Sequence, residues 1–313
     1  MKKSPALLGV LPVSLLLAFL AAACGSSAKD DGKTSVIASF YPFAYVVEQV
    51  GGSFVDVTNL TSPGVEPHDL ELRPKQVGAV QDGDLVVYEK HFQSAVDDAV
   101  DQSGRSAADT VDVSAIVKLK PLQAGAEDGG HDDAGGGGGK QDDPHVWLDP
   151  ENMAIVTKAV AAKLAKIDPA HATEFAANAR RLEAQLADLD SAFASGLEKC
   201  RTRTIVTSHA AFQYLAAHYG LTQVPIAGLD PTNEPSPAQL ASITQLVRRE
   251  KITTIFTEEL VSPAIARTIA RETGASTATL DPIEGLSDDT KGQTYLTLMR
   301  YNLDTLMKAN SCP

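Results

Sequence analysis

The segment PAHATEFAANARRLEAQLADLDSAFASGLEK, residues 169–199, has the most regular hydrophobic pattern in the chain. Its apolar positions recur at spacings of three and four residues: Phe175, Ala179, Leu182, Leu186, Leu189, Phe193 and Leu197. This spacing places them on one face of an α-helix. Such a helix would be about 45 Å long, which exceeds the length of a typical domain helix. We therefore expect it to connect two lobes as a rigid strut. A coiled-coil dimer seam is the alternative, although the segment holds only about four heptads.

Strand and helix signals alternate on both sides of this helix. Short β-branched runs predict strands at 35–39, 55–60, 84–88, 203–207, 253–257 and 277–280. Helices are predicted at 41–49, 74–80, 151–165 and 290–309. The alternation implies an α/β fold in which each lobe is a parallel sheet flanked by helices. The predicted boundaries are residues 35–166 for the N-terminal lobe, 167–200 for the linker helix and 201–313 for the C-terminal lobe.

The N-terminal segment has the features of an export signal rather than of a membrane-spanning helix. Lys2 and Lys3 precede an apolar stretch over residues 7–23. Small residues then lead to Cys24, as in a bacterial lipoprotein processing site, although Ala21 replaces the usual Leu. We predict a signal peptide over 1–23, a lipidated Cys24 and a flexible tether over 24–34. The exported protein would then be anchored to the outer face of the cytoplasmic membrane. An ordinary secretory signal with an incidental cysteine is the alternative.

The charge of the chain limits its partners. A net charge of −13 argues against nucleic acid, whose phosphates require a basic surface. It suits a solvated extracytoplasmic protein and favours cations nearby without selecting one.

Residues 125–143 break the strand–helix pattern with acidic residues and five consecutive glycines. We expect a mobile surface loop there, because such a segment cannot pack a core. It is interpreted either as a low-affinity collector of cations or as an insertion without a function of its own.

Four residues are the candidate metal ligands: His68, His145, His209 and Asp281. Their spacings of 77, 64 and 72 residues form no local motif, so only the fold could bring them together. His209 and Asp281 follow predicted strands, at the ends where open α/β sheets place ligand sites. Three neutral imidazoles and one carboxylate suit zinc best, with manganese and iron as the alternatives.

Five segments carry a resemblance to a known family: GVEPHDLELRP, DPHVWLDP, TSHAAFQYLAAHYGL, IFTEE and LDPIEGL. They resemble the metal-binding lipoproteins of zinc and manganese ABC importers. The resemblance implies two lobes joined by one long helix, with the metal in the cleft between them. It also implies delivery of the ion to an ABC permease and its ATPase, by a protein expected to be a monomer.

The resemblance maps the family's metal positions onto His68, His145, His209 and Asp281. A histidine at the third of these positions resembles the zinc importers, whereas manganese importers usually have Glu there. On an extra role in adhesion the sequence is silent.

A zinc metallohydrolase is the competing function, since zinc held by three histidines can activate a water. Catalysis would require an open ligand position and a general base, for which only Glu258 and Glu259 are available. Asp281 as a fourth ligand would close the shell, so we expect no enzymatic activity.

The other cysteines are Cys200 and Cys312. In an exported chain such a pair is predicted to form a disulfide, with two free buried thiols as the alternative.

Overall fold

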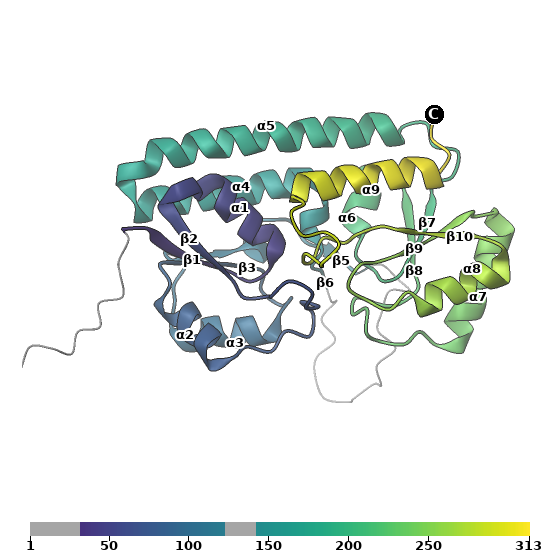
Figure 1. The fold of residues 1–313 in the computed structure, drawn as a ribbon, viewed down its shortest axis with the longest axis horizontal. Helices are drawn as coiled ribbons and strands as arrows, with labels where there is room; N and C mark the ends of the chain where they lie inside the picture. The colour runs from purple at the N-terminus through teal and green to yellow at the C-terminus, as the bar shows by residue number, and fades with distance from the viewer. Residues whose placement is uncertain (1–31, 123–141) are drawn as a thin grey trace, which may run out of the picture. The chain divides into compact units, whose positions relative to one another are not determined.

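A computed structural model describes residues 32–122 and 142–313 (Figure 1). The predicted signal peptide, Cys24, most of the tether and nearly all of the acidic loop lie outside the described residues. Within the described part, no helix has the length and apolar character needed to cross a membrane.

The first sheet contains four parallel strands in the order β2-β1-β3-β4. Their bounds are β1 Thr34–Ala38, β2 Val55–Asn59, β3 Leu85–Tyr88 and β4 Thr110–Asp112. Residues of β1 alternate between two apolar clusters, as expected for a strand buried on both faces. Val36 and Ala38 pack with α1 (Tyr41–Gly51) and α4 (Pro150–Ile167), whereas Ile37 packs with α2 (Pro74–Asp82) and α3 (Ser94–Ser103).

The second sheet repeats this plan with the order β10-β9-β7-β8, again all parallel. Its strands are β7 Thr204–Thr207, β8 Thr222–Pro225, β9 Thr254–Thr257 and β10 Ser276–Thr279. Val206 and Ile255 pack with α7 (Pro237–Glu250) and α8 (Ala264–Thr273). Ile205 and Phe256 face the cluster that includes α6 (Gln213–His218) and α9 (Tyr295–Ala309).

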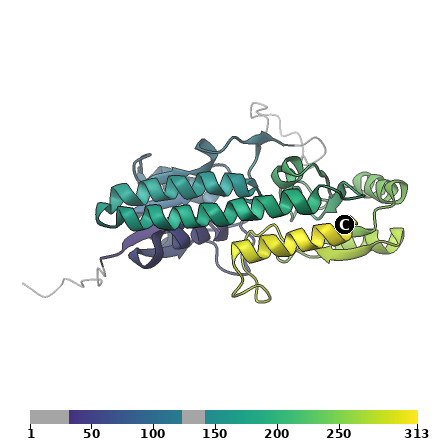
Figure 2. The same ribbon diagram turned by 90° about the horizontal axis from the view of Figure 1, so that it is seen from above.

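The long helix α5, Ala172–Leu197, runs beside both sheets (Figures 1 and 2). All seven residues of its apolar stripe are buried, against α1, α4 and α9 of the same chain. The coiled-coil alternative is therefore wrong. The helix has 26 residues, or about 39 Å, because residues 169–171 form a separate 3-10 turn. The predicted α/β architecture with a long connecting helix is confirmed.

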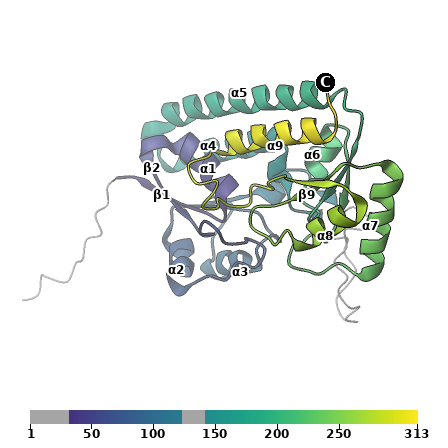
Figure 3. The same cartoon turned by 45° about the vertical axis from the view of Figure 1, so that its right-hand side comes forward.

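Helix α9 lies directly along α5 (Figure 3). A Cβ on Gly196 would come within 3.0 Å of the sulfur of Met307, so this glycine allows the close approach. The helix begins at Tyr295, five residues later than predicted, because Thr294 and Thr297 form a capping box at its start.

A disulfide joins Cys200, just after α5, to Cys312, just after α9. It links the ends of two helices that already pack together.

We expect the Cys200→Ser, Cys312→Ser double variant to unfold more easily than the wild type. The bond joins residues 112 positions apart, and in the chain-entropy model a loop of that size contributes up to about 4.7 kcal/mol. Denaturant unfolding measures the loss. Alkylation of unreduced protein followed by mass spectrometry checks the bond, and uptake of label by both cysteines would show that it is absent.

Candidate metal centre

The three histidines of the candidate set come from three different loops. His209 lies just after β7, and His145 follows the short strand β6 (Asp142–Asp143) and opens the 3-10 turn Val146–Leu148. His68 lies between β2 and α2, directly after Pro67. Proline restricts the backbone of this segment and keeps it out of helix or central strand. The fold thus brings together loops from both sheets.

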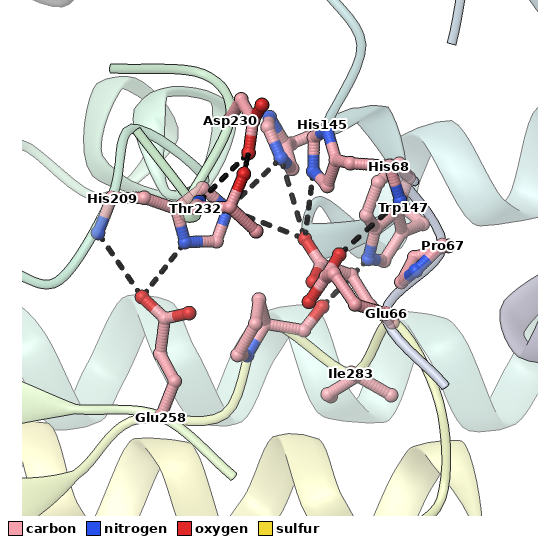
Figure 4. A network of polar contacts seen from close by, with 12 residues as sticks. Glu66, Pro67, His68, His145, Trp147, His209, Asp230, Thr232, Glu258 and Ile283 are labelled. Atoms are coloured by element: carbon pink, nitrogen blue, oxygen red, sulfur yellow. Dashed lines mark hydrogen bonds and ion pairs between the residues drawn. The ribbon is translucent and has the colours of Figure 1, made fainter. Parts of the chain in front are cut away.

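The side chains of His68, His145 and His209 point toward one another (Figure 4). Together with Glu284 they form one cluster. One donor atom from each lies within 4.8 Å of the others. Glu284 Oε1 is 3.5 Å from His68 Nε2, 3.4 Å from His145 Nε2 and 3.3 Å from His209 Nε2. His145, His209 and Glu284 are almost completely buried, and the His68 side chain is 9% exposed.

The carboxylate in this cluster is Glu284, so the sequence prediction of Asp281 needs a correction. Asp281 Oδ1 accepts a hydrogen bond from the backbone N–H of Ile283, at 2.7 Å. This contact closes a tight turn in which Ile283 has a φ of 58°, a left-handed value that is rare for a β-branched residue. Burial raises the pKa of Asp281 to about 7, against the opposing hydrogen bond from Ile283. Asp281 therefore supports the turn that presents Glu284, three residues further along the chain.

Two carboxylates hold the imidazoles in position. Asp143 Oδ1 lies 2.8 Å from His145 Nδ1, and Glu258 Oε1 lies 2.8 Å from His209 Nδ1. Each carboxylate also accepts the backbone N–H of the same histidine. With Nδ1 engaged in this way, Nε2 of both rings is left to face the cluster, as in many metal sites.

Trp147 forms an apolar wall beside His145. It is completely buried, and its ring centre lies 5.1 Å from that of His145. Its indole N–H donates to the carbonyl of Pro282 at 2.7 Å. The same tryptophan therefore ties the loop of His145 to the turn before Glu284.

The charges within the cluster compensate one another. Burial alone would raise the pKa of Glu284, but the charge of His209 and the close approach of the three imidazoles lower it well below its ordinary value. Burial alone would lower the pKa of His209, but the charges of Glu258 and Glu284 raise it well above its ordinary value. For His68 the effect of burial is larger than the opposing effect of Glu284, so its pKa lies below the ordinary value. Glu284 and His209 thus shift each other's pKa in opposite directions.

A divalent cation fits this donor set. Within the described residues, His68 Nε2 and both carboxylate oxygens of Glu284 are buried atoms without a hydrogen-bond partner. Buried polar atoms normally have partners, so these atoms indicate a place for one. Imidazole nitrogens and a carboxylate oxygen are ligands that zinc takes in a tetrahedral arrangement. Glu66 adjoins the cluster, with Oε1 bonded to the backbone N–H of His68 and Oε2 buried without a partner in the described part.

Several known proteins are similar to this chain, and their names refer to zinc. Residues 36–309 match the family model described as zinc-uptake complex component A, periplasmic. The zinc-binding lipoprotein AdcA of Streptococcus pneumoniae is 38% identical over 301 residues, which cover 94% of this chain and 60% of AdcA. The high-affinity zinc uptake system protein ZnuA of Bacillus subtilis is 38% identical, with 92% of each chain covered.

The fold is also that of solved structures. The Zn(II)-bound ZnuA-like domain of Streptococcus pneumoniae AdcA superposes with a TM-score of 0.74 at 34% identity, covering 89% of this chain and 99% of that one. The chain thus spans 60% of the length of the AdcA relative but nearly all of its ZnuA-like domain.

Proposed function

Because the chain belongs to the ZnuA family of zinc-uptake complex components, we propose that it binds zinc outside the cytoplasm and delivers the ion to an ABC importer. One observation carries this proposal: the convergence of three buried or nearly buried imidazoles on the Glu284 carboxylate. The proposed ligands are His68, His145, His209 and Glu284.

The donor set supports transport better than hydrolysis. Glu284 would fill the fourth position of a tetrahedral shell, whereas catalytic zinc keeps that position open for water. Glu258, one of the two candidate bases, is bonded to both Nδ1 and the backbone N–H of His209. A carboxylate that orients a ligand is poorly placed to take a proton from a bound water.

The nitrogen-rich shell favours zinc over manganese, since manganese prefers carboxylate and carbonyl oxygens. Competition titration of the demetallated protein tests this preference. We expect one zinc ion per chain, and we expect manganese not to displace it at equal concentration. Displacement by equimolar manganese would assign the protein to the alternative metal.

Anchoring and assembly belong to the same proposal. A lipid on Cys24 would hold the protein at the outer face of the cytoplasmic membrane, where it would meet the permease and its ATPase as a monomer. The relatives named lipoproteins support this arrangement. Replacing Cys24 by Ser should release the protein from cells into the medium.

We expect the two carboxylates of the turn 281–284 to differ strongly in their effect on zinc affinity. Glu284→Gln should weaken zinc binding by about a hundredfold, because the variant removes a charged oxygen ligand. Asp281→Asn is the matched control, since its side-chain oxygen can still accept the N–H of Ile283. It should change the affinity by about tenfold or less, the low end for groups behind the ligands. The opposite ranking in a chelator competition would restore Asp281 as the ligand.

The apparent zinc affinity should fall as the pH falls. Despite burial, carboxylates raise the pKa of both His145 and His209 in the metal-free protein. Zinc must displace these protons, so weakening begins above the ordinary histidine value of about 6.5 and continues below it. Competition against a chelator of known affinity at several pH values measures the trend. An affinity that is constant from pH 8 to pH 6 would contradict the histidine shell.

A further inference from the structure

The proposed ligand Glu284 is carried by a turn that lies just past the end of an edge strand. Strand β10 is one of the two edge strands of the second sheet, next to β9. The hydrogen bond from the backbone N–H of Leu280 to the carbonyl of Thr257, in β9, continues the pairing past the end of β10. The backbone N–H and C=O of the next residue, Asp281, therefore point to the open side of the sheet. Asp281 is only 3% exposed, so these two groups need a partner within the protein.

Asn302 bonds to both of these backbone groups. Its side-chain Oδ1 accepts the N–H of Asp281 at 2.9 Å, and its Nδ2 donates to the carbonyl of the same residue at 2.6 Å. Asn302 lies in the middle of α9 and is completely buried. A side-chain amide offers both an acceptor and a donor, as a backbone peptide group does. The side chain therefore pairs with the edge of the sheet as a neighbouring strand would, and it attaches the turn to α9.

The turn needs this support because its backbone is strained. Ile283 has a φ of 58°, and a β-branched residue keeps a left-handed backbone only where the surrounding structure fixes it. Ile283 lies beside the cluster (Figure 4), directly before Glu284. If Asp281 could move, Ile283 could relax toward an ordinary conformation and carry the Glu284 carboxylate away from the histidines. The position of Asp281 therefore determines where Glu284 lies.

The same face of α9 also bonds to the segment that carries His145. Tyr295 precedes Asn302 by seven residues, or about two helical turns, so both side chains lie on one face. The Tyr295 hydroxyl donates to the carbonyl of Trp147 at 2.6 Å, and the indole N–H of Trp147 donates to the carbonyl of Pro282 at 2.7 Å. Both segments are thus attached to α9 and to each other. Helix α9 packs along α5 and ends beside the disulfide, so it gives both segments a stable support.

We propose that Asn302 is a positioning residue, whose amide fixes the turn 281–284 and thereby holds the Glu284 carboxylate where the zinc ion binds. The proposal rests on the zinc site proposed above and adds a residue of α9 that lies behind the ligands. Loss of the amide would leave the N–H and C=O of Asp281 buried without partners, which favours a different path for the turn. Zinc binding should then weaken through Glu284, whereas two of the imidazoles keep the carboxylates that orient them.

Zinc affinity, measured by chelator competition in a double-mutant cycle, tests the proposal. Asn302→Leu keeps the branched shape of the side chain but removes both hydrogen bonds. We expect it to weaken zinc binding by about tenfold, the low end for groups behind the ligands. In the Glu284→Gln background the same change should weaken binding by less than about twofold, because the interaction on which it acts is already lost. Asn302→Ser, which leaves room for water in place of the amide, should act in the same direction and takes its place in the cycle if Asn302→Leu does not fold.

Leu306→Ala is the matched control. Leu306 lies one turn further along α9 and is completely buried, but its side chain is apolar and cannot bond to the turn. The variant leaves a cavity and should lower the stability of the fold. Its zinc affinity should nevertheless stay within about twofold of the wild-type value, because the site and the cavity are independent.

Three results would overturn the inference. An unchanged affinity in Asn302→Leu would show that the turn keeps its position without the amide. An equal loss in both backgrounds would show that Asn302 does not act through Glu284. An equal loss in Leu306→Ala would show that any weakening of α9 has the same effect. Each of these results leaves wild-type zinc binding intact, whereas failure of the proposed function is separate, since the wild type would then bind no zinc.

Discussion

Replacing His209 with Ala should lower the zinc affinity by about a thousandfold or more. The variant removes one of four proposed ligands, whereas groups behind the ligands typically change metal affinity by ten- to a hundredfold. It also leaves Glu258 and Glu284 buried without the imidazole that now lies between them. An uncompensated buried charge is costly, and water or a proton must replace the lost partner. Chelator competition, or calorimetry with zinc, measures the change.

His171→Ala is the matched control for that experiment. His171 is also hydrogen-bonded to a carboxylate, yet it precedes α5 and belongs to none of the loops of the cluster. This variant should keep the wild-type zinc affinity. Retention of wild-type affinity by His209→Ala would show that the proposed shell is wrong.

Zinc should raise the stability of the wild-type protein by about 4 kcal/mol when the free ion is at a thousand times its dissociation constant. The proposed ligands come from loops of both sheets, so the assembled site would exist only in the folded chain. At roughly 2–4 °C per kcal/mol for a chain of this size class, the melting temperature should rise by about 10 °C.

The gain in stability on adding zinc should require the proposed metal ligands. His209→Ala should show almost none of it at the same zinc concentration, whereas His171→Ala should show all of it. A wild-type melting temperature that does not respond to zinc at neutral pH would contradict a site restricted to the native state.

The sequence predicts the fold correctly in segments where the spacing of apolar or β-branched residues is regular. The apolar stripe of α5 has helical spacing, and every one of its seven residues is buried. Short β-branched runs likewise marked β1, β3 and β7, because strands covered on both faces need such residues. Helices α7 and α8 were not assigned. Both pack against one face of the second sheet and contribute residues to its apolar cluster.

The sequence predicts a site residue well where that residue directly follows a strand. His209 follows β7 directly, so the ligand rule for parallel sheets located it. The same rule selected Asp281 because it is the first carboxylate after β10. The turn that bonds Asp281 to Ile283 and carries Glu284 to the cluster depends on an unusual backbone conformation. The available signal for Glu284 was its place in the segment LDPIEGL.

The sequence does not predict which side chains hydrogen-bond to the proposed ligands or which residues of neighbouring helices pair. Asp143 is close to His145 along the chain, but Glu258 reaches His209 across 49 residues. His218, at the end of α6, lies 3.0 Å from Asp149 at the start of α4 and 3.5 Å from Asp190 of α5, and these contacts depend on how the three helices pack. No periodicity in the sequence encodes such a distance, because each contact is set by tertiary structure.

The packing of α5 against both halves of the protein affects how fast the proposed zinc ion can be exchanged. One continuous helix packs with elements of both halves, and its end is covalently attached to the segment after α9. A large swing of one half against the other would have to bend this helix or expose its stripe, at a cost of about 1.5–3 kcal/mol for each large apolar side chain. Small displacements of the loops around His68 and Glu284 are far less costly. The residence time of the ion should therefore reflect local loop motion, and a partner that pulls on those loops could empty the site without unfolding either sheet.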